Sequence, residues 1–191
     1  MLDFSTAAPL CPPALTRPGH DTEPAGGSAQ LALSPYQAGW PARFRVEAEV
    51  LRVALSALSP TVEHVGSTAV PSLAARPVID ILVGLPAPLL IDAFAARLSN
   101  FGYIVLPPSQ DDGVRVVVRR LRGVRTHHVQ VVATYGHDWH RILLFRDLLR
   151  HDEALARQYT LVKLDLMRQH QGNAVAYASG KASFIRAIVG A

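Results

Sequence analysis

The sequence has almost no cysteine, no long apolar run and no basic start, and each shortage excludes a class of protein. The single cysteine, Cys11, excludes a disulfide framework and a zinc ribbon, both of which need several cysteines. No apolar run reaches the roughly 18 residues that span a bilayer. The first residues include Asp3 but no early lysine or arginine, unlike the basic start of a signal peptide. We therefore expect a cytoplasmic protein that does not engage a membrane.

The sequence also has little excess of charge of either sign. With 19 basic and 15 acidic residues, the net charge is +4, too little by itself to predict nucleic-acid binding. Of the basic residues 17 are arginines, and the two lysines are Lys163 and Lys181. Hydrophobic residues make up 49% of the 191 residues and charged residues 18%, which excludes global disorder and favours a sizeable core.

Residues 1–30 differ in composition from the remainder of the chain. They hold five prolines and three glycines, which remove backbone donors and raise the entropy lost on folding. We expect residues 1–30 to form a flexible Pro/Gly-rich tail and residues 31–191 to form one domain.

The apolar pattern of the domain predicts an α/β fold, with a mixed β-sheet flanked by helices and a helical C-terminal layer. Helices are expected over 37–58, 70–75, 87–100 and, with a break at Gly172, from 139 to the end. Strands are expected over 61–65, 78–85, 103–106, 114–121 and 124–134. The last two strands flank Arg122-Gly123 and read as a β-hairpin. The hairpin arginines fit either a rim for an acidic ligand or a charged edge that resists edge pairing: Arg115, Arg119, Arg120, Arg122 and Arg125.

A Gly66-Ser67-Thr68 turn follows the strand predicted at 61–65. If a short helix begins there, its free backbone N–H groups and the two hydroxyls would form a cradle for an anion. Glycine would let a phosphate approach the backbone closely. Arg76, just before the next strand, could reach a phosphate in the cradle, although a solvated loop charge is equally compatible with the sequence.

Asp80 is the one carboxylate in the apolar strand 78–85. An acid in a buried strand costs several kcal/mol unless it is paired, neutralised or bound to a metal. Asp80 is therefore expected to have a partner, and the best candidate strand, 127–133, offers His127 and His128.

Together these motifs resemble the GrpB family and, more distantly, the nucleotidyltransferase superfamily. The superfamily pattern places Gly-Ser after a strand and an Asp-x-Asp strand next, with its second Asp about 14 residues beyond the Gly; here Gly66 and Asp80 are 14 residues apart. The family's remaining signatures match at Tyr36, Trp40, Phe44, Glu47, Phe145-Arg146-Asp147, Leu149-Arg150, Tyr159, Lys163, Tyr177, Lys181, Phe184 and Ile185. The resemblance implies a nucleotidyltransferase-like fold and covers nearly all of the domain.

The resemblance also implies roles for particular residues. Asp80 would be the catalytic carboxylate, and a nucleotide or phosphorylated metabolite would be the ligand. The residues expected to contact its phosphates are Gly66, Ser67, Thr68, Arg76, Lys163 and Lys181. In some relatives this module is fused to a dephospho-coenzyme A kinase, which suggests a link to nucleotide or coenzyme metabolism.

The sequence departs from the superfamily where two carboxylates normally hold Mg²⁺. The position of the first Asp is Val78, and of the family's His-x-His pattern only His128 is present, since the next position is Gln130. Two interpretations stay open. Asp80 and His128, with His64, could hold one divalent ion such as Mg²⁺, Mn²⁺ or Zn²⁺. Alternatively, His128 pairs with Asp80 and the cradle binds an anion without chemistry.

The function expected from the sequence is binding of a nucleotide or phosphorylated metabolite, with nucleotidyl or phosphate-group transfer if the protein is active. Val78 in place of an acid favours an alternative, a catalytically silent nucleotide-binding or regulatory domain. A metal-dependent hydrolase using Asp80 and His128 is the other alternative. No nucleic-acid partner is expected.

Overall fold

A mixed five-stranded sheet forms the centre of the domain. The computed structural model describes residues 33–86, 91–106, 115–121, 123–170 and 173–190. The strands lie in the order β1-β2-β5-β4-β3. The neighbours β2 and β5 are parallel, and the other neighbouring pairs are antiparallel. The strands are β1 (Thr61–Val65), β2 (Ile79–Leu85), β3 (Tyr103–Val105), β4 (Arg115–Leu121) and β5 (Val124–Ala133).

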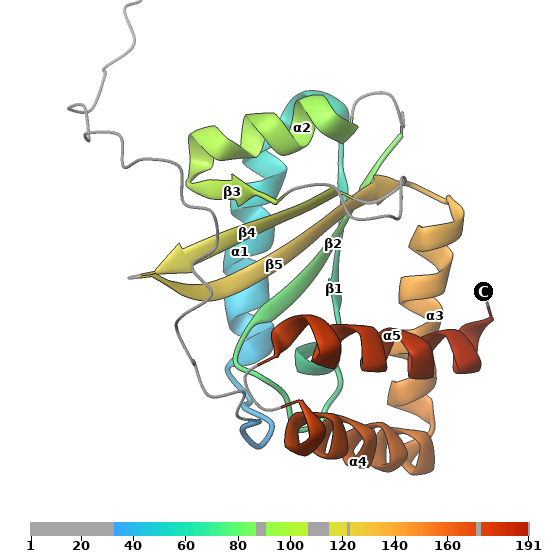
Figure 1. Ribbon diagram of the computed structural model, residues 1–191. Coiled ribbons are helices and arrows are strands. Elements are labelled where there is room, and N and C mark those ends of the chain that lie inside the picture. Colours follow the sequence, from blue (N-terminus) through green and yellow to red (C-terminus); the bar gives the residue numbers. More distant parts are fainter. Residues whose placement is uncertain (1–32, 87–90, 107–114, 122, 171–172, 191) are drawn as a thin grey trace, which may run out of the picture.

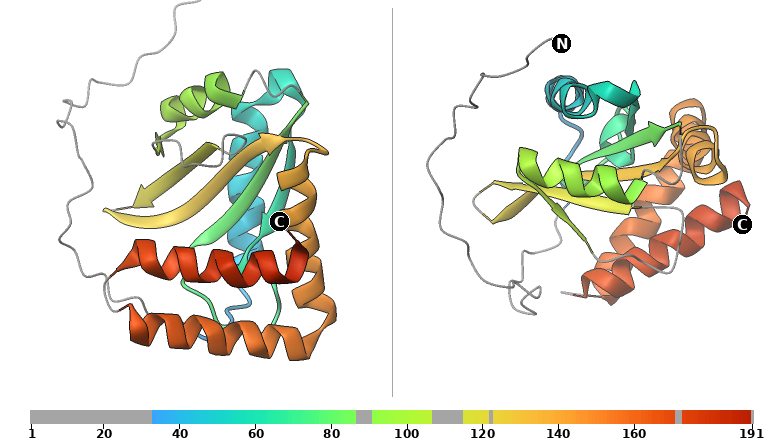
Figure 2. Two further views of the ribbon diagram at one scale, coloured as in Figure 1. Left: turned by 45° about the vertical axis from the view of Figure 1, so that its right-hand side comes forward. Right: turned by 90° about the horizontal axis from the view of Figure 1, so that it is seen from above.

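Helices lie on both sides of this sheet, as the sequence predicts. Helices α1 and α2 pack on one face, whereas α3, α4 and α5 form a C-terminal layer on the other side (Figures 1 and 2). Their bounds are α1 (Trp40–Ala54), α2 (Ile91–Leu98), α3 (His137–His151), α4 (Glu153–Gln169) and α5 (Ala174–Val189). Asp152 and Asn173 cap α4 and α5 by accepting hydrogen bonds from backbone N–H groups.

The alternation of side chains along β2 decides which residues reach each layer. Ile79, Ile81 and Val83 point into the core beneath α1 and α2, and all three are fully buried. The residues between them point to the opposite face, where Leu82 joins the cluster around Trp139 of α3. The same alternation puts Asp80 on the side of the C-terminal helices.

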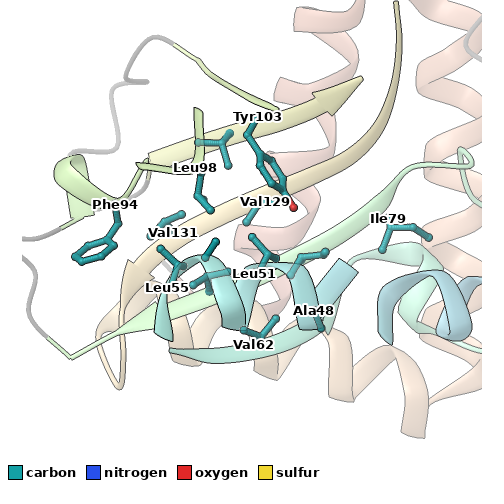
Figure 3. Packing of buried hydrophobic residues seen from close by; sticks show 14 of the residues in the cluster. Ala48, Leu51, Leu55, Val62, Ile79, Phe94, Leu98, Tyr103, Val129 and Val131 are labelled. Atoms are coloured by element: carbon teal, nitrogen blue, oxygen red, sulfur yellow. The ribbon is translucent and has the colours of Figure 1, made fainter. Parts of the chain in front are cut away.

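The main core lies between the sheet and the helices α1 and α2 (Figure 3). Leu51 of α1 and Leu55, just after its end, pack with Val129 and Val131 of β5 in one cluster, which Leu98 of α2 completes. These five side chains are fully buried. This packing anchors β2 and β5, the two strands that carry Asp80 and His128.

The short helix expected over 70–75 is wrong. Only Ser67–Ala69 forms a single turn of 3-10 helix, and the chain then bends. Ser72 adopts a left-handed backbone conformation with φ 66°. Ala75 exchanges backbone hydrogen bonds of 2.9 and 3.0 Å with Ser34, which holds the segment extended. The Gly-Ser-Thr turn therefore does not open an α-helix, and no helix N-terminus supports the anion cradle.

The other expected elements are present with shifted ends. The helix over 37–58 is α1 followed by a 3-10 turn, and the helix over 87–100 begins at Ile91 among the described residues. The hairpin of β4 and β5 is confirmed and carries a β-bulge between Arg119 and Arg120. Residues 1–30, Arg122 and Gly172 lie outside the described residues. None of the described helices is long and apolar enough to cross a bilayer.

Candidate functional site

A cavity of about 220 Å³ lies where the amino-terminal part of β2 and strand β5 meet the C-terminal helices. Six of the nine residues that the sequence marks as candidate site residues line it: Ser67, Arg76, Asp80, His128, Lys163 and Lys181. They come from the turn after β1, from β2, β5, α4 and α5, and from the segment before β2. The structure thus brings together residues that are up to 114 positions apart in the chain (67 to 181).

Asp80 has the partner that its place in an apolar strand requires. Asp80 and His128 are direct partners in the register of the parallel strands β2 and β5. His128 Nδ1 lies 3.0 Å from Asp80 Oδ1, and both side chains are partly exposed to the cavity. The pairing interpretation of Asp80 and His128 therefore has a direct hydrogen bond behind it.

The electrostatic surroundings keep Asp80 ionised. Burial by itself raises the pKa of the Asp80 carboxyl. The hydrogen bond and charge of His128, together with the positive charges of Lys181 and Arg76, outweigh burial and hold this pKa below its usual value. Burial lowers the pKa of both Lys163 and Lys181, and the negative charge of Asp80 partly offsets this effect in each of them. Asp80 therefore lies at the electrostatic centre of the cavity.

Lys163 is a buried cation, with only 2% of its surface exposed. Its ammonium group donates to Ser67 Oγ at 3.3 Å and to the carbonyl oxygen of Ala74, and it lies 4.9 Å from the ring centre of Tyr159. Burial, with a smaller contribution from the charge of Lys181, lowers the pKa of Lys163 to about 7. The burial of Lys163 excludes a role as a solvated charge on the surface of α4.

Lys181 and Arg76 lie against one aromatic ring. The Lys181 ammonium is 4.7 Å and the Arg76 guanidinium 5.5 Å from the ring centre of Tyr177. Neither group donates a hydrogen bond to a residue in the described part of the chain. Burial lowers the pKa of Lys181, and the charge of Arg76 adds to this effect. Arg76 and Lys181 therefore bring to the cavity cationic donors that no described residue accepts.

The other three candidate residues lie close by but do not line this cavity. Gly66 adopts φ 67°, and a Cβ atom built there would lie 2.4 Å from Asp80 Oδ2, so Gly66 leaves room for the carboxylate. Thr68 is buried, and its Oγ1 lies 3.0 Å from His64 Nε2. His64 stacks on Phe44 of α1 at 4.7 Å, on the sheet face opposite to Asp80. Burial lowers the pKa of His64 to about 4, which keeps its ring neutral.

The donor set does not fit the pair of Mg²⁺ ions used in two-metal phosphate transfer. Within the described ranges no three His, Cys, Asp or Glu side chains gather into a group that could hold a metal ion. Among the described residues, Asp80 is the one carboxylate lining the cavity, and Val78, two residues earlier, lines it with an apolar side chain. His64, on the other face of the sheet, does not join Asp80 and His128.

Sequence reasoning missed two sets of contacts in and around the site. Tyr177 is buried and also lines the cavity, where its ring lies against Lys181 and Arg76. Arg146, in the Phe-Arg-Asp signature, donates to Glu63 at 2.8 Å and to the His64 carbonyl at 3.2 Å, and so ties α3 to β1. The spacing of Tyr177 and Lys181, four residues apart on a predicted helix, was the available signal for the first of these.

Comparisons with known proteins agree with this geometry. The family model described as GrpB protein matches residues 30–190. A UPF0157 protein of Pseudomonas aeruginosa is 36% identical over 164 residues, which cover 84% of this chain and 67% of that protein. The crystal structure of the conserved protein GrpB from Enterococcus faecalis superposes with a TM-score of 0.73 and 32% identity, covering 82% of this chain and 94% of that one.

More distant similarity extends to the nucleotidyltransferase fold. The Cid1 poly(U) polymerase, in a structure bound to MgATP, matches with a TM-score of 0.52 and 14% identity. The match covers 76% of this chain and 50% of that one. At this identity the likeness establishes the fold alone, and it confirms the fold expected from the sequence.

Proposed function

Because the chain belongs to the GrpB family and has a nucleotidyltransferase-like fold, we propose that it binds a nucleotide or a phosphorylated metabolite through the phosphate groups. The cavity around Asp80 is the proposed binding site. One observation carries the proposal: Arg76 and Lys181 line this cavity, and neither donates a hydrogen bond to a residue in the described part of the chain.

The charge of the cavity favours an anion. Arg76, Lys163 and Lys181 line it, and Asp80 is the one carboxylate among the described residues of the lining. Guanidinium and ammonium groups bind phosphate through charge-assisted hydrogen bonds, which are about twice as strong as neutral ones. Holding such groups together and partly out of water is costly unless a compensating charge is present. A phosphate group would supply that charge.

A thermal-shift screen of the purified protein tests the proposal. The ligands are nucleoside mono-, di- and triphosphates, coenzyme A precursors and inorganic pyrophosphate, each with chelator, Mg²⁺, Mn²⁺ or Zn²⁺. A ligand that binds only the folded state stabilises it by about 2.7 kcal/mol at a hundred times its Kd. Arg76→Met is expected to weaken the shift, whereas Arg168→Met, an exposed charge on α4, is the control. The absence of a shift with every phosphate compound in every condition would exclude the proposal.

A second candidate function is transfer of a nucleotidyl group to a hydroxyl acceptor. It is favoured by the lowered pKa of Asp80, which leaves an ionised carboxylate facing the cavity. In such a step Asp80 would take the proton of the acceptor hydroxyl, whose oxygen attacks the α-phosphorus while pyrophosphate leaves. Release of pyrophosphate from a nucleoside triphosphate, lost in Asp80→Asn, would support transfer. Binding without release would leave a silent binding domain.

A further inference from the structure

The lining of the cavity is rich in cations and poor in metal ligands. Arg76, Arg125, Lys163 and Lys181 line it, and Asp80 is the carboxylate they face. A divalent ion placed beside Asp80 would be repelled by these positive charges. The same charges would attract a phosphate group directly. The cavity is thus suited to the anion more than to a metal ion that would bridge the anion to the protein.

Lys163 lines the cavity and makes two hydrogen bonds to described residues. An ammonium group has three donors, and Lys163 uses two of them on Ser67 Oγ and the Ala74 carbonyl. Both acceptors belong to the segment that connects β1 with β2, so the ammonium is held in place from two sides. Lys163 is nearly fully buried and still contributes to the lining, which leaves its third donor for a ligand.

Lys181 approaches from a different helix and is held by a ring. It extends from α5, with its ammonium over Tyr177 one turn earlier. No residue in the described ranges accepts a hydrogen bond from it. Two ammonium groups from α4 and α5 therefore lie on the same cavity as Asp80 and feel its charge. The chain has no other lysine.

Building on the proposed function, we infer that Lys163 and Lys181 supply the positive charge that metal ions supply in two-metal nucleotidyl transfer, so that the cavity binds a phosphate group without a divalent cation. The ligand class is a phosphate monoester or diphosphate carrying at least two negative charges. Asp80 then acts on the lysines through its charge and is not a metal ligand.

Titration calorimetry with inorganic pyrophosphate tests this inference. The full chain is titrated at pH 6 once in EDTA and once in Mg²⁺, at equal concentrations of free pyrophosphate. Binding in EDTA that is as tight as binding in Mg²⁺ is the expected result. Binding that appears only with Mg²⁺, Mn²⁺ or Zn²⁺ would overturn the inference but leave the proposed function in place. No binding of pyrophosphate in any condition would also overturn the inference, whereas the proposed function would fall only if the nucleotides and coenzyme A precursors of the thermal-shift screen failed as well.

Variants of the two lysines separate their charge from their bulk. Lys163→Met and Lys181→Met keep the length of the side chain and are each expected to weaken pyrophosphate binding in EDTA about tenfold to a hundredfold. Arg168→Met and Arg186→Met remove an exposed charge from the same two helices and are the matched controls. Equal losses in the lysine variants and the controls would overturn the inference, because they would indicate net charge alone.

Asp80→Asn changes pyrophosphate binding in opposite directions, depending on whether Asp80 holds a metal ion or the lysines hold the phosphate. If Asp80 holds a metal ion, its loss weakens binding in Mg²⁺ and leaves little in EDTA. If the lysines hold the phosphate, the loss of a facing negative charge strengthens pyrophosphate binding in EDTA several-fold at pH 6. This variant retains a side chain that can hydrogen-bond to His128, and its circular dichroism checks that the fold is kept.

Discussion

The Asp80 carboxylate lies directly against Gly66, so closely that a Cβ atom there would lie 2.4 Å from Oδ2. Gly66 also has φ 67° and ψ −170°, a region of backbone conformation that is essentially restricted to glycine. The glycine of the Gly-Ser-Thr turn thus shapes the site by making room for the carboxylate. It was expected from the sequence to make room for a phosphate.

Gly66→Ala is expected to destabilise the fold more than backbone strain alone. Gly102→Ala is the control for a positive φ, because Gly102 has φ 80° in the left-handed helical region and open space where its Cβ would lie. The control is expected to cost about 1–2 kcal/mol, and Gly66→Ala at least about 1 kcal/mol more, because its backbone conformation is the more restricted and Asp80 must move. Urea unfolding measures both variants. Equal losses would contradict both the backbone restriction and the close contact with Asp80 at Gly66.

Lys163 is expected to make stability rise with pH above neutrality. Its pKa falls from 10.5 to about 7 on folding, so between these values the unfolded chain binds a proton that the folded chain has released. The free energy of unfolding then increases with pH, by up to about 1.4 kcal/mol per unit. Lys181, whose pKa is also lowered, contributes with the same sign.

The measurement is urea unfolding from pH 7 to about 9.5, below the range where the buried Tyr159 and Tyr177, whose pKa values are raised, act with the opposite sign. Lys163→Met should flatten the pH dependence, and Arg168→Met should retain it. A slope that persists in Lys163→Met would show that other groups cause it.

His64 is expected to destabilise the fold in acid. Its pKa is 6.5 in the unfolded chain and about 4 in the fold, so protonation favours unfolding as the pH falls through this window. The loss amounts to about 3 kcal/mol between the two values. His64→Gln should remove this loss, whereas His137→Gln, at an exposed position, should not. Unfolding curves at pH 6.5 and pH 4 measure this loss of stability. If His64→Gln lost as much stability in acid as the unchanged protein, His64 would not be the group responsible.

Leu51 is expected to be essential to the core beneath the site. Leu51→Ala removes a fully buried side chain and is expected to cost about 2–5 kcal/mol. Val53, two residues away on the same helix, is 68% exposed, and Val53→Ala should change stability by no more than about 0.5 kcal/mol. Chemical unfolding measures both. Similar losses at the two positions would contradict the orientation of α1.

The parts of the fold that sequence reasoning found are those with strong local signals. The Val-rich strands and their Arg122-Gly123 connection predict the hairpin, and the apolar run around Asp80 predicts β2. The prediction of a helix over 70–75 was wrong because backbone hydrogen bonds with Ser34, distant in the sequence, hold Ala75 in an extended conformation. Apolar composition cannot show such a long-range hydrogen bond.

The site shows the same division between local and distant information. The pairing of Asp80 with His128 could be predicted because a carboxylate in an apolar strand needs a partner. The register of β2 and β5 brings the two residues together. The expectation that His64 joins Asp80 and His128 at a metal ion does not fit the structure, because β1 directs His64 to the opposite face of the sheet. The burial of Lys163 was not predictable, since it depends on how α4 packs against the Ser67–Ala75 segment.

The chain's two lysines both line one cavity, and this makes amine chemistry a probe of that cavity. Reagents that acylate or reductively alkylate lysine have no lysine elsewhere in the chain to react with, apart from the α-amino group. The extent of modification, read peptide by peptide in a mass spectrometer, would therefore report occupancy of the cavity directly. By the same reasoning, enzymatic acetylation of lysine in this protein would fall on the cavity, where one acetyl group would remove a positive charge and fill space.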